Sequence, residues 1–259
     1  VELAKKVLKK RGPAKVVVAS NVVAHIDDLA DVIEGVKILI GDKGIFVMEA
    51  HWVGNLLGLV GDGGFDQIYH EHLSYFSLSA LKKLFNRLGL KIFDVNLIPI
   101  HGQSLQIYAG QNRGISKSVK EFLEKEKELG LDKTQTYLNF AKKVEKNRSE
   151  LRGLLLRLKQ ENKKIVGYGA PAKGNVLLNY CKMGNEILDF IVDDSFLKQG
   201  LYTPGTHIPI YPPDRLKEHQ PDYLLLLAWN YAEAILKKEK ALRDKGVKFI
   251  MPISRVRII

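Results

Sequence analysis

The stretch Lys15-Val16-Val17-Val18-Ala19-Ser20 is a continuous run of β-branched and small apolar residues. Such a run is typical of a strand that is covered on both faces, as in a parallel sheet. Helical spacing follows in Leu29–Ile40, and a second apolar run, Gly44–Glu49, comes after a Gly-Asp-Lys-Gly turn. Strand, helix and strand in this order predict a βαβ crossover unit and the α/β class.

Two further segments predict how this sheet ends. Ser79–Gly89 has a serine at its start and a glycine at its end, which indicates a helix. Lys91–Ile98 and Ser104–Ala109 are strand-like and lie on either side of a His101-Gly102 turn. They predict an antiparallel hairpin at the end of a parallel sheet.

The second half of the sequence predicts another α/β unit. Residues 114–163 have the spacing of long amphipathic helices. The segments that follow are expected to be strands, with helices over Val176–Lys182 and up to Arg243, and these strands are Lys164–Gly169, Ile187–Val192, Tyr223–Ala228 and Val247–Met251. The alternation predicts a Rossmann-like domain.

Composition narrows the class of protein. The 259 residues are 46% hydrophobic and contain one cysteine, Cys181. No segment approaches the roughly 20 apolar residues of a membrane span, and the first residues do not resemble a secretory signal. We therefore expect a soluble cytoplasmic protein with no membrane partner, no internal disulfide and no zinc site built from several thiolates.

The net charge of +11 favours anionic partners without choosing among them. Much of the excess lies in helical segments where lysines and glutamates alternate along a solvated face, which favours a role in solubility. The sequence has no nucleic-acid recognition motif and no interleaving of aromatic and basic residues, so nucleic acid is not an expected partner.

The string Phe65-Asp66-Gln67-Ile68-Tyr69-His70-Glu71-His72-Leu73-Ser74-Tyr75-Phe76 concentrates imidazoles, carboxylates and phenols with little helical periodicity. Such groups suit proton transfer near neutral pH. Two other interpretations remain open. The side chains would simply satisfy a buried loop, or His70 and His72 would ligate a metal, although no further ligands follow at a recognisable spacing.

Polar residues also follow the first two predicted strands. Asn21 and His25 come after the first strand, and Glu49 and His51 end the second. Ligands of open α/β sheets bind outside the carboxyl ends of the strands, so these residues are candidates for a site. Each of them would also serve as an ordinary loop residue.

In the second half, Gly167-Tyr168-Gly169-Ala170-Pro171-Ala172-Lys173-Gly174-Asn175 joins a strand to a helix. Glycines permit close backbone approach, a helix start offers free amides, and Lys173 adds positive charge, so the segment suits a phosphate. Its spacing differs from the dinucleotide fingerprint. Asp193-Asp194 ends the next strand where a ribose-binding acid would lie, although acids also end strands for ordinary turn reasons. For the glycine segment, a structural turn without a ligand remains the alternative.

Several ordered strings resemble the sugar C-methyltransferases that act on nucleotide-linked 4-keto-deoxysugars. They run along essentially the whole chain and are NVVAHIDDL, FDQIYHEHLSYFSL, HGQSLQIYAG, GYGAPAKGN, YTPGTHIPIYPPDRL and PDYLLLLAWNYAEAIL. The resemblance implies part of a class I methyltransferase sheet in residues 1–113 and a C-terminal domain in 114–259, with a helical connector over 114–163 and a Rossmann-like part over 164–259.

The resemblance also implies a mechanism. A base removes the proton beside the sugar ketone, and the resulting enolate carbon attacks the methyl group of S-adenosylmethionine. His72 would be the base, Tyr69 and Glu71 would orient it or the sugar, and His25 would assist. The donor would be contacted along the edge that begins at Asn21 and Val22.

The implied partner is a nucleotide-linked sugar of the dTDP type, enclosed with help from the C-terminal domain. The candidates for that contact are Lys173, Asn175, Tyr202, Thr203, His207 and Asn230.

Family members normally begin with a four-cysteine zinc module and a glycine-rich donor loop. We expect this chain to be truncated before these elements, to carry no zinc and to need an N-terminal complementing polypeptide. Gln103 stands where the family pattern has a second glycine.

Two other functions remain open. The first is a non-catalytic module that binds a nucleotide sugar through residues 164–259. The second, which the residues favour least, is an oxidoreductase or epimerase with a dinucleotide at Gly167–Gly174, because Pro171-Ala172-Lys173 spoils the fingerprint.

Overall fold

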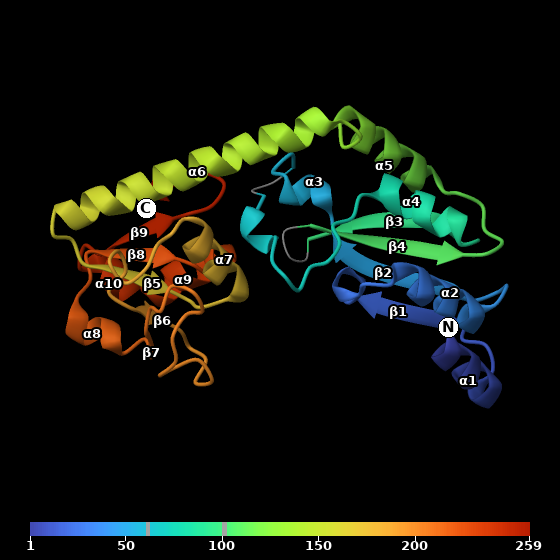
Figure 1. Ribbon diagram of the computed structural model, residues 1–259, viewed down its shortest axis with the longest axis horizontal. Helices are drawn as coiled ribbons and strands as arrows, with labels where there is room; N and C mark the ends of the chain where they lie inside the picture. The colour runs from blue at the N-terminus through green and yellow to red at the C-terminus, as the bar shows by residue number, and fades with distance from the viewer. Residues whose placement is uncertain (61–62, 100–102) are drawn as a thin grey trace. The chain divides into compact units, whose positions relative to one another are not determined.

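The computed structural model describes residues 1–60, 63–99 and 103–259 (Figure 1). The chain forms two compact units. Unit 1 comprises Val1–Gly63 and His70–Leu138, and unit 2 comprises Gly64–Tyr69 and Asn139–Ile259. The domain boundary expected at residue 113 is a different division, between family segments, and stays a prediction.

Unit 1 is built on a four-stranded sheet of order β1-β2-β4-β3. Its strands are β1 (Val16–Ser20), β2 (Ile45–His51), β3 (Lys91–Ile98) and β4 (Ser104–Gly110). β1 and β2 are parallel, whereas β4 runs antiparallel to both β2 and β3. The predicted crossover unit and hairpin are therefore confirmed, while the His101-Gly102 turn lies outside the described residues.

The helices of unit 1 are α1 (Glu2–Arg11), η1 (Val23–His25), α2 (Leu29–Ile40), α3 (Val53–Leu56), α4 (Leu78–Arg87) and α5 (Lys117–Glu128). Among them, α2, α4 and α5 begin at polar side-chain caps. Asp28 caps α2 by accepting from the Asp31 amide at 2.9 Å. Ser77 accepts from the Ala80 amide at 3.1 Å, so α4 begins slightly before the predicted Ser79.

The prediction that the Val16–Ser20 strand is covered on both faces is wrong. β1 is an edge strand of the described sheet, and its outward-facing Val16 and Val18 are 50% and 67% exposed. The apolar run indicated a strand correctly, but a run of this kind does not reveal which of its neighbours the chain supplies.

Unit 2 is built on a six-stranded sheet of order β10-β9-β8-β5-β6-β7. Its strands are β5 (Ile165–Tyr168), β6 (Ile191–Val192), β7 (Ile210–Tyr211), β8 (Tyr223–Leu226), β9 (Lys248–Met251) and β10 (Arg257–Ile258). The first five in chain order are parallel and β10 is antiparallel to β9. This arrangement confirms a second Rossmann-like sheet.

The helices of unit 2 differ in detail from the expected ones. They are η2 (Phe65–Gln67), α6 (Thr134–Gln160, whose first residues belong to unit 1), α7 (Ala172–Tyr180), α8 (Arg215–His219), η3 (Trp229–Tyr231), α9 (Ala232–Lys238) and α10 (Lys240–Asp244). α7 begins before the predicted Val176, so Lys173 and Asn175 lie on a helix rather than in a loop. The strand expected from Ile187 is shorter, because Ile187 and Leu188 belong to a buried turn instead.

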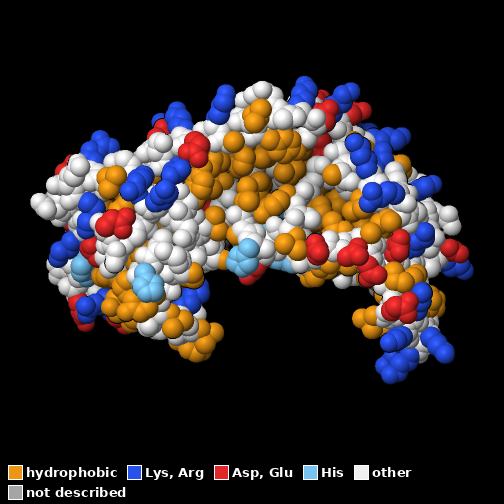
Figure 2. Space-filling model, viewed as in Figure 1, with side chains coloured by type: hydrophobic (Ala, Val, Ile, Leu, Met, Phe, Trp, Pro, Cys, Tyr) orange, Lys and Arg blue, Asp and Glu red, His pale blue; other side chains and the backbone are white. Residues whose placement is uncertain are grey.

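Buried apolar residues join α6 to the sheet of unit 2. Leu151 and Leu155 have no exposed surface and pack in one core with Ile165 of β5 and Ile250 of β9. None of the helices in the described residues is long and apolar enough to cross a membrane. Figure 2 shows lysine and arginine side chains spread over the visible face rather than gathered in one patch.

Candidate functional site

Three histidines of unit 1 form a cluster. The ring centroids of His25 and His72 are 5.0 Å apart, and those of His51 and His72 are 5.1 Å apart. The Tyr75 ring meets His72 edge-on at 6.1 Å. We call His25, His51 and His72 the histidine cluster. His72 is the member that contacts both others.

Backbone pairing explains why residues so far apart in sequence meet. Ser20 at the end of β1 pairs with Glu49 of β2, so both strands end at the same edge of the sheet. The turn after β1 carries His25, and the segment with His72 is bound to this turn. The amides of Leu73 and Ser74 donate to the Ala24 carbonyl at 2.8 and 3.2 Å. The cluster thus lies at the carboxyl edge, where sites of α/β sheets form.

Asn21 and Glu49 form a polar pair at this edge. Asn21 Nδ2 donates to Glu49 Oε1 at 2.7 Å, and the Asn21 amide donates to the Glu49 carbonyl at 2.9 Å. Asn21 has a φ of 53°, a left-handed conformation that asparagine tolerates better than most residues. Its Oδ1 atom is buried and accepts no hydrogen bond within the described chain. Val22 beside it is 51% exposed.

The string Phe65–Phe76, which we call the acid–base string, is divided between the two units. Its first part, Phe65–Tyr69, belongs with Gly64 to unit 2, and the string re-enters unit 1 at His70. Tyr69 and His72 are half-buried, and Glu71 is exposed. The structure therefore brings His72 together with His25 in unit 1 and places Tyr69 with unit 2.

The metal interpretation gains nothing from this geometry. Among the described residues, no group of three or more histidine, cysteine, aspartate or glutamate side chains is arranged to hold a metal ion. The single cysteine, Cys181, is buried, and burial raises its pKa to about 12, so its thiol stays protonated and is a poor ligand.

In unit 2 the glycine-rich segment packs closely onto the end of β8. A Cβ atom on Gly169, whose φ is +84°, would lie 2.6 Å from the Ala228 Cβ, and one on Gly174 would lie 2.9 Å from the Leu227 Cβ. The Ala170 amide already donates to Asp193 Oδ2 at 2.6 Å. Close packing therefore explains these glycines without a ligand. The Ala170 amide is already bonded to Asp193, so it is not available to bind the predicted phosphate.

Asp66, Trp229 and Lys173 form a second polar group in unit 2, which we call the Asp66 group. Asp66 has no exposed surface, and Trp229 Nε1 donates to its Oδ2 at 2.6 Å. Lys173 Nζ lies 4.5 Å from the centroid of the Trp229 ring. Burial raises the pKa of Asp66 to about 6, and burial also lowers the pKa of Lys173.

Sequence reasoning missed the roles of Asp66 and Trp229 in this group. Asp66 stood in the quoted string, but nothing in the string distinguishes a buried carboxyl from an exposed one. Trp229 adjoins Asn230, a predicted contact residue that is exposed on η3.

The other predicted contact residues of unit 2 lie around α7. Tyr202 and His207 stack with centroids 5.2 Å apart, and both are exposed. Thr203 is buried, and its hydroxyl accepts from the Ile208 amide at 2.9 Å, which gives it a structural role in its own turn. Asn175 has a buried Oδ1 without a hydrogen bond in the described chain.

Asn179 links α7 to this turn, and the sequence did not single it out. Its Nδ2 atom donates to the Asn175 carbonyl at 2.9 Å and to the Pro204 carbonyl at 3.0 Å. The predicted residues Asn175 and Thr203 are thus joined indirectly, through a side chain that holds both segments.

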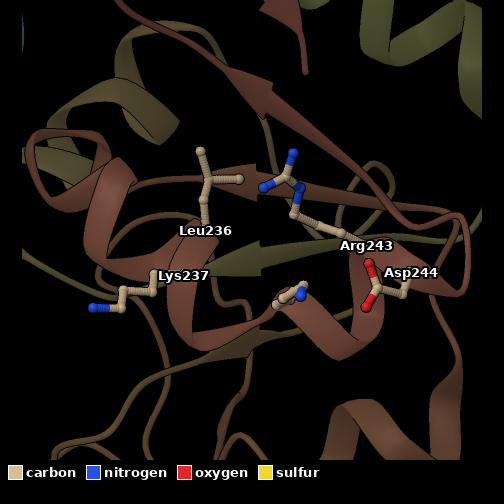
Figure 3. A pocket seen from close by; sticks show the side chains of 5 residues that line it. Leu236, Lys237, Arg243 and Asp244 are labelled. Atoms are coloured by element: carbon tan, nitrogen blue, oxygen red, sulfur yellow. The ribbon is translucent and has the colours of Figure 1, made fainter.

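A separate surface hollow lies along α9 and α10. Its lining residues are Leu236, Lys237, Lys240, Arg243 and Asp244. Figure 3 shows Lys237 and Arg243 extending in different directions, so the hollow does not converge on one ligand atom. It contains none of the predicted site residues.

Comparison with known families assigns both halves of the chain. Residues 2–95 match the family described as "Methyltransferase domain", and residues 99–254 match "C-methyltransferase C-terminal domain". The C-methyltransferase NovU of Streptomyces niveus is 38% identical over 261 residues, a match that covers 100% of this chain and 61% of the relative. The chain thus spans less than two thirds of that relative's length.

Similar solved structures overlap only in part. The structure of TnmH is 21% identical and covers 38% of this chain and 31% of its own, with a TM-score of 0.29. The O-methyltransferase NcsB1, in complex with S-adenosylmethionine, is 19% identical and covers 42% of this chain and 38% of its own, also with a TM-score of 0.29. At such scores the overlaps carry no argument. The family matches do, and on them this chain belongs to the C-methyltransferase family.

Proposed function

We propose that this chain carries the acid–base and sugar-binding part of an S-adenosylmethionine-dependent C-methyltransferase whose substrate is a nucleotide-linked 4-keto-deoxysugar. The observation that carries the proposal is the histidine cluster at the carboxyl edge of β1 and β2. The match of residues 99–254 to the C-methyltransferase C-terminal domain supports the reaction class.

His72 is proposed as the base. A neutral imidazole is a base of suitable strength to accept a proton from the carbon beside a ketone. His25 and His51 border the His72 ring, and His25 is the proposed donor to the developing enolate oxygen. Tyr69 and Glu71 orient the sugar or the base.

Asn21 and Val22 are proposed to contact the methyl donor, which supplies an electrophilic methyl sulfonium when bound. Asn21 fits this role in one respect, because its buried Oδ1 has no hydrogen-bond donor within the described chain. The Glu49 carboxylate holds the Asn21 amide group in place from the other side. Asn21 would therefore present a preoriented acceptor to a donor N–H or O–H group.

Lys173 is the proposed contact for the diphosphate of the nucleotide sugar. Lys173 takes part in no ion pair among the described residues, and its ammonium lies over the Trp229 ring. Asn175, Tyr202, His207 and Asn230 are proposed to contact the remainder of the nucleotide sugar. The substrate is proposed to be of the dTDP type.

The exposed edge of β1 is the proposed contact for a complementing polypeptide. Val16 and Val18 expose apolar surface beside an unpaired backbone edge, and the curated relative is longer than this chain. A strand of the complementing polypeptide would pair with β1 and cover these valines. Val18→Lys should reduce the association of this chain with the complementing polypeptide, measured by sedimentation velocity at several concentrations. Val7→Lys, on exposed α1, is the control for added charge.

Proton exchange tests the base without requiring a methyl donor. A 4-keto-deoxysugar linked to dTDP is incubated with the chain in D₂O, and deuterium at the carbon beside the ketone is followed by NMR. We expect exchange well above the rate without protein. Binding of the sugar nucleotide without exchange would favour the non-catalytic binding module. Methyl transfer itself is measured in a second experiment, after the complementing polypeptide is added.

A further inference from the structure

The segment Gly64–Tyr69 is held by unit 2 although the string continues in unit 1. Phe65 is buried in the core of unit 2, and its ring lies 5.3 Å from that of Tyr180 on α7. A Cβ atom on Gly64 would lie 3.2 Å from the Trp229 ring and 2.8 Å from Gln67 Nε2. A side chain at position 64 would therefore be crowded against the Trp229 ring of η3.

Asp66 is the polar anchor of the segment. One carboxyl oxygen, Oδ2, accepts from the Trp229 indole, whereas Oδ1 is buried and accepts no hydrogen bond within the described chain. A fully buried carboxyl with one unused oxygen is costly for folding alone. Residues of this kind are retained more readily where they serve a site.

The indole ring of Trp229 also contacts the side chain of Lys173. The ammonium lies over the Trp229 ring at 4.5 Å, and the negative charge of Asp66 opposes the effect of burial on the Lys173 pKa. A cation over an indole face is attracted by the ring quadrupole, and a nearby carboxylate adds to that attraction. The place of Lys173 is therefore set by the two residues that also anchor Gly64–Tyr69.

We propose that Asp66 is a positioning residue which, through Trp229, couples the anion-binding Lys173 to the segment that ends in Tyr69. Binding of a nucleoside diphosphate group at Lys173 and placement of Gly64–Tyr69 are then parts of one event. The identity of the anion rests on the proposed function, but the coupling of the three side chains does not.

Asp66→Asn tests the coupling, because the amide keeps the shape of the carboxyl and the acceptor for the indole while removing the charge. The emission of Trp229 is obtained as the difference between the chain and its Trp229→Phe variant, since the sequence has 2 tryptophans. In the unmodified chain we expect this emission to titrate with a midpoint near the Asp66 pKa of about 6. Lys173 is the charged group that faces Asp66 from α7, so Lys173→Gln should move the midpoint upward.

Binding of thymidine diphosphate is measured on the same variants by calorimetry. We expect Asp66→Asn to weaken binding about fivefold to tenfold although Lys173 is intact, and Asp244→Asn, an exposed control, to leave it unchanged. If Asp66 only stabilised the fold, Asp66→Asn would lower the melting temperature and leave the affinity of the folded protein for thymidine diphosphate unchanged.

Equal affinity in Asp66→Asn and the unmodified chain overturns the inference, as does a Trp229 emission that does not depend on Asp66. Absence of thymidine diphosphate binding by the unmodified chain also overturns it. Neither the Trp229 emission nor the thymidine diphosphate affinity depends on methyl transfer or deuterium exchange. Failure of the proposed reaction can therefore be told apart from failure of this coupling.

Discussion

The imidazole rings of His25 and His72 lie 5.0 Å apart and are tilted by 59° in unit 1. His25 ends the short η1 helix after β1, and His72 lies on a segment bound to the Ala24 carbonyl. Two imidazole side chains, from segments far apart in the sequence, thus share one edge of the sheet. His51 extends the pair along the end of β2.

Replacing the proposed base should remove proton exchange and spare binding. In His72→Gln we expect the rate of deuterium incorporation into the keto sugar to fall by about a hundredfold or more, the usual contribution of a general base. The affinity for the sugar nucleotide, measured by calorimetry, should stay within about twofold. His219→Gln is the matched control, because His219 pairs with Asp189 in unit 2 and belongs to no proposed site. Unchanged exchange in His72→Gln would remove the residue from the base role.

Glu126 is expected to be a major contributor to the stability of unit 1. Its buried carboxylate accepts from Trp52 Nε1 at 2.9 Å and from the amides of Leu78 and Ser79 at 2.6 and 2.8 Å. Glu126→Ala leaves these donors without an acceptor and should lower the free energy of unfolding by about 2–4 kcal/mol.

Urea denaturation followed by the near-ultraviolet signal of Trp52 measures this loss. Glu128→Ala, at an exposed position of the same helix, should change stability by less than about 0.5 kcal/mol. Equal stabilities of the two variants would contradict the assignment.

Gln103 is expected to be strained. Its φ of 108° lies in the region that favours glycine, and its buried Oε1 has no hydrogen bond within the described chain. Gln103→Gly relieves both costs and should raise the free energy of unfolding by about 1 kcal/mol. Gln103→Ala keeps the unfavourable φ and should stabilise less. A melting temperature that rises equally in both variants would show that the amide, not the backbone, is responsible.

Stability of unit 2 should depend on the titration of Asp66. Burial raises its folded pKa to about 6 from an ordinary value of 3.8, so the folded state binds the proton more tightly than the unfolded state. The associated stability is fully present below pH 3.8 and is lost as pH rises through about 6. Its full size is on the order of 3 kcal/mol.

Asp66→Asn removes this contribution from the pH profile. The stability of the variant, measured by urea denaturation between pH 4 and 8, should decline less than that of the unmodified chain over the same window. Asp222→Asn serves as a control at a partly exposed carboxyl of the same unit. Parallel profiles for Asp66→Asn and the unmodified chain would show that Asp66 does not titrate as described.

Local sequence patterns were sufficient for the elements that depend on nearby residues. The helical spacing of Leu29–Ile40, the hairpin of β3 and β4 and the family strings each depend on residues close together in the chain. For the same reason the string around His72 could be recognised as chemically unusual.

Tertiary structure alone decided burial, pairing and edges. The exposure of Val18, the membership of Tyr69 in unit 2 and the burial of Asp66 beside Trp229 depend on which distant segments pack together. The same valine run suits a central or an edge strand, and the same aspartate suits a solvated loop or a dry interior. Their surroundings come from elements far away in the sequence, and it is those surroundings that set solvation, charge and pKa.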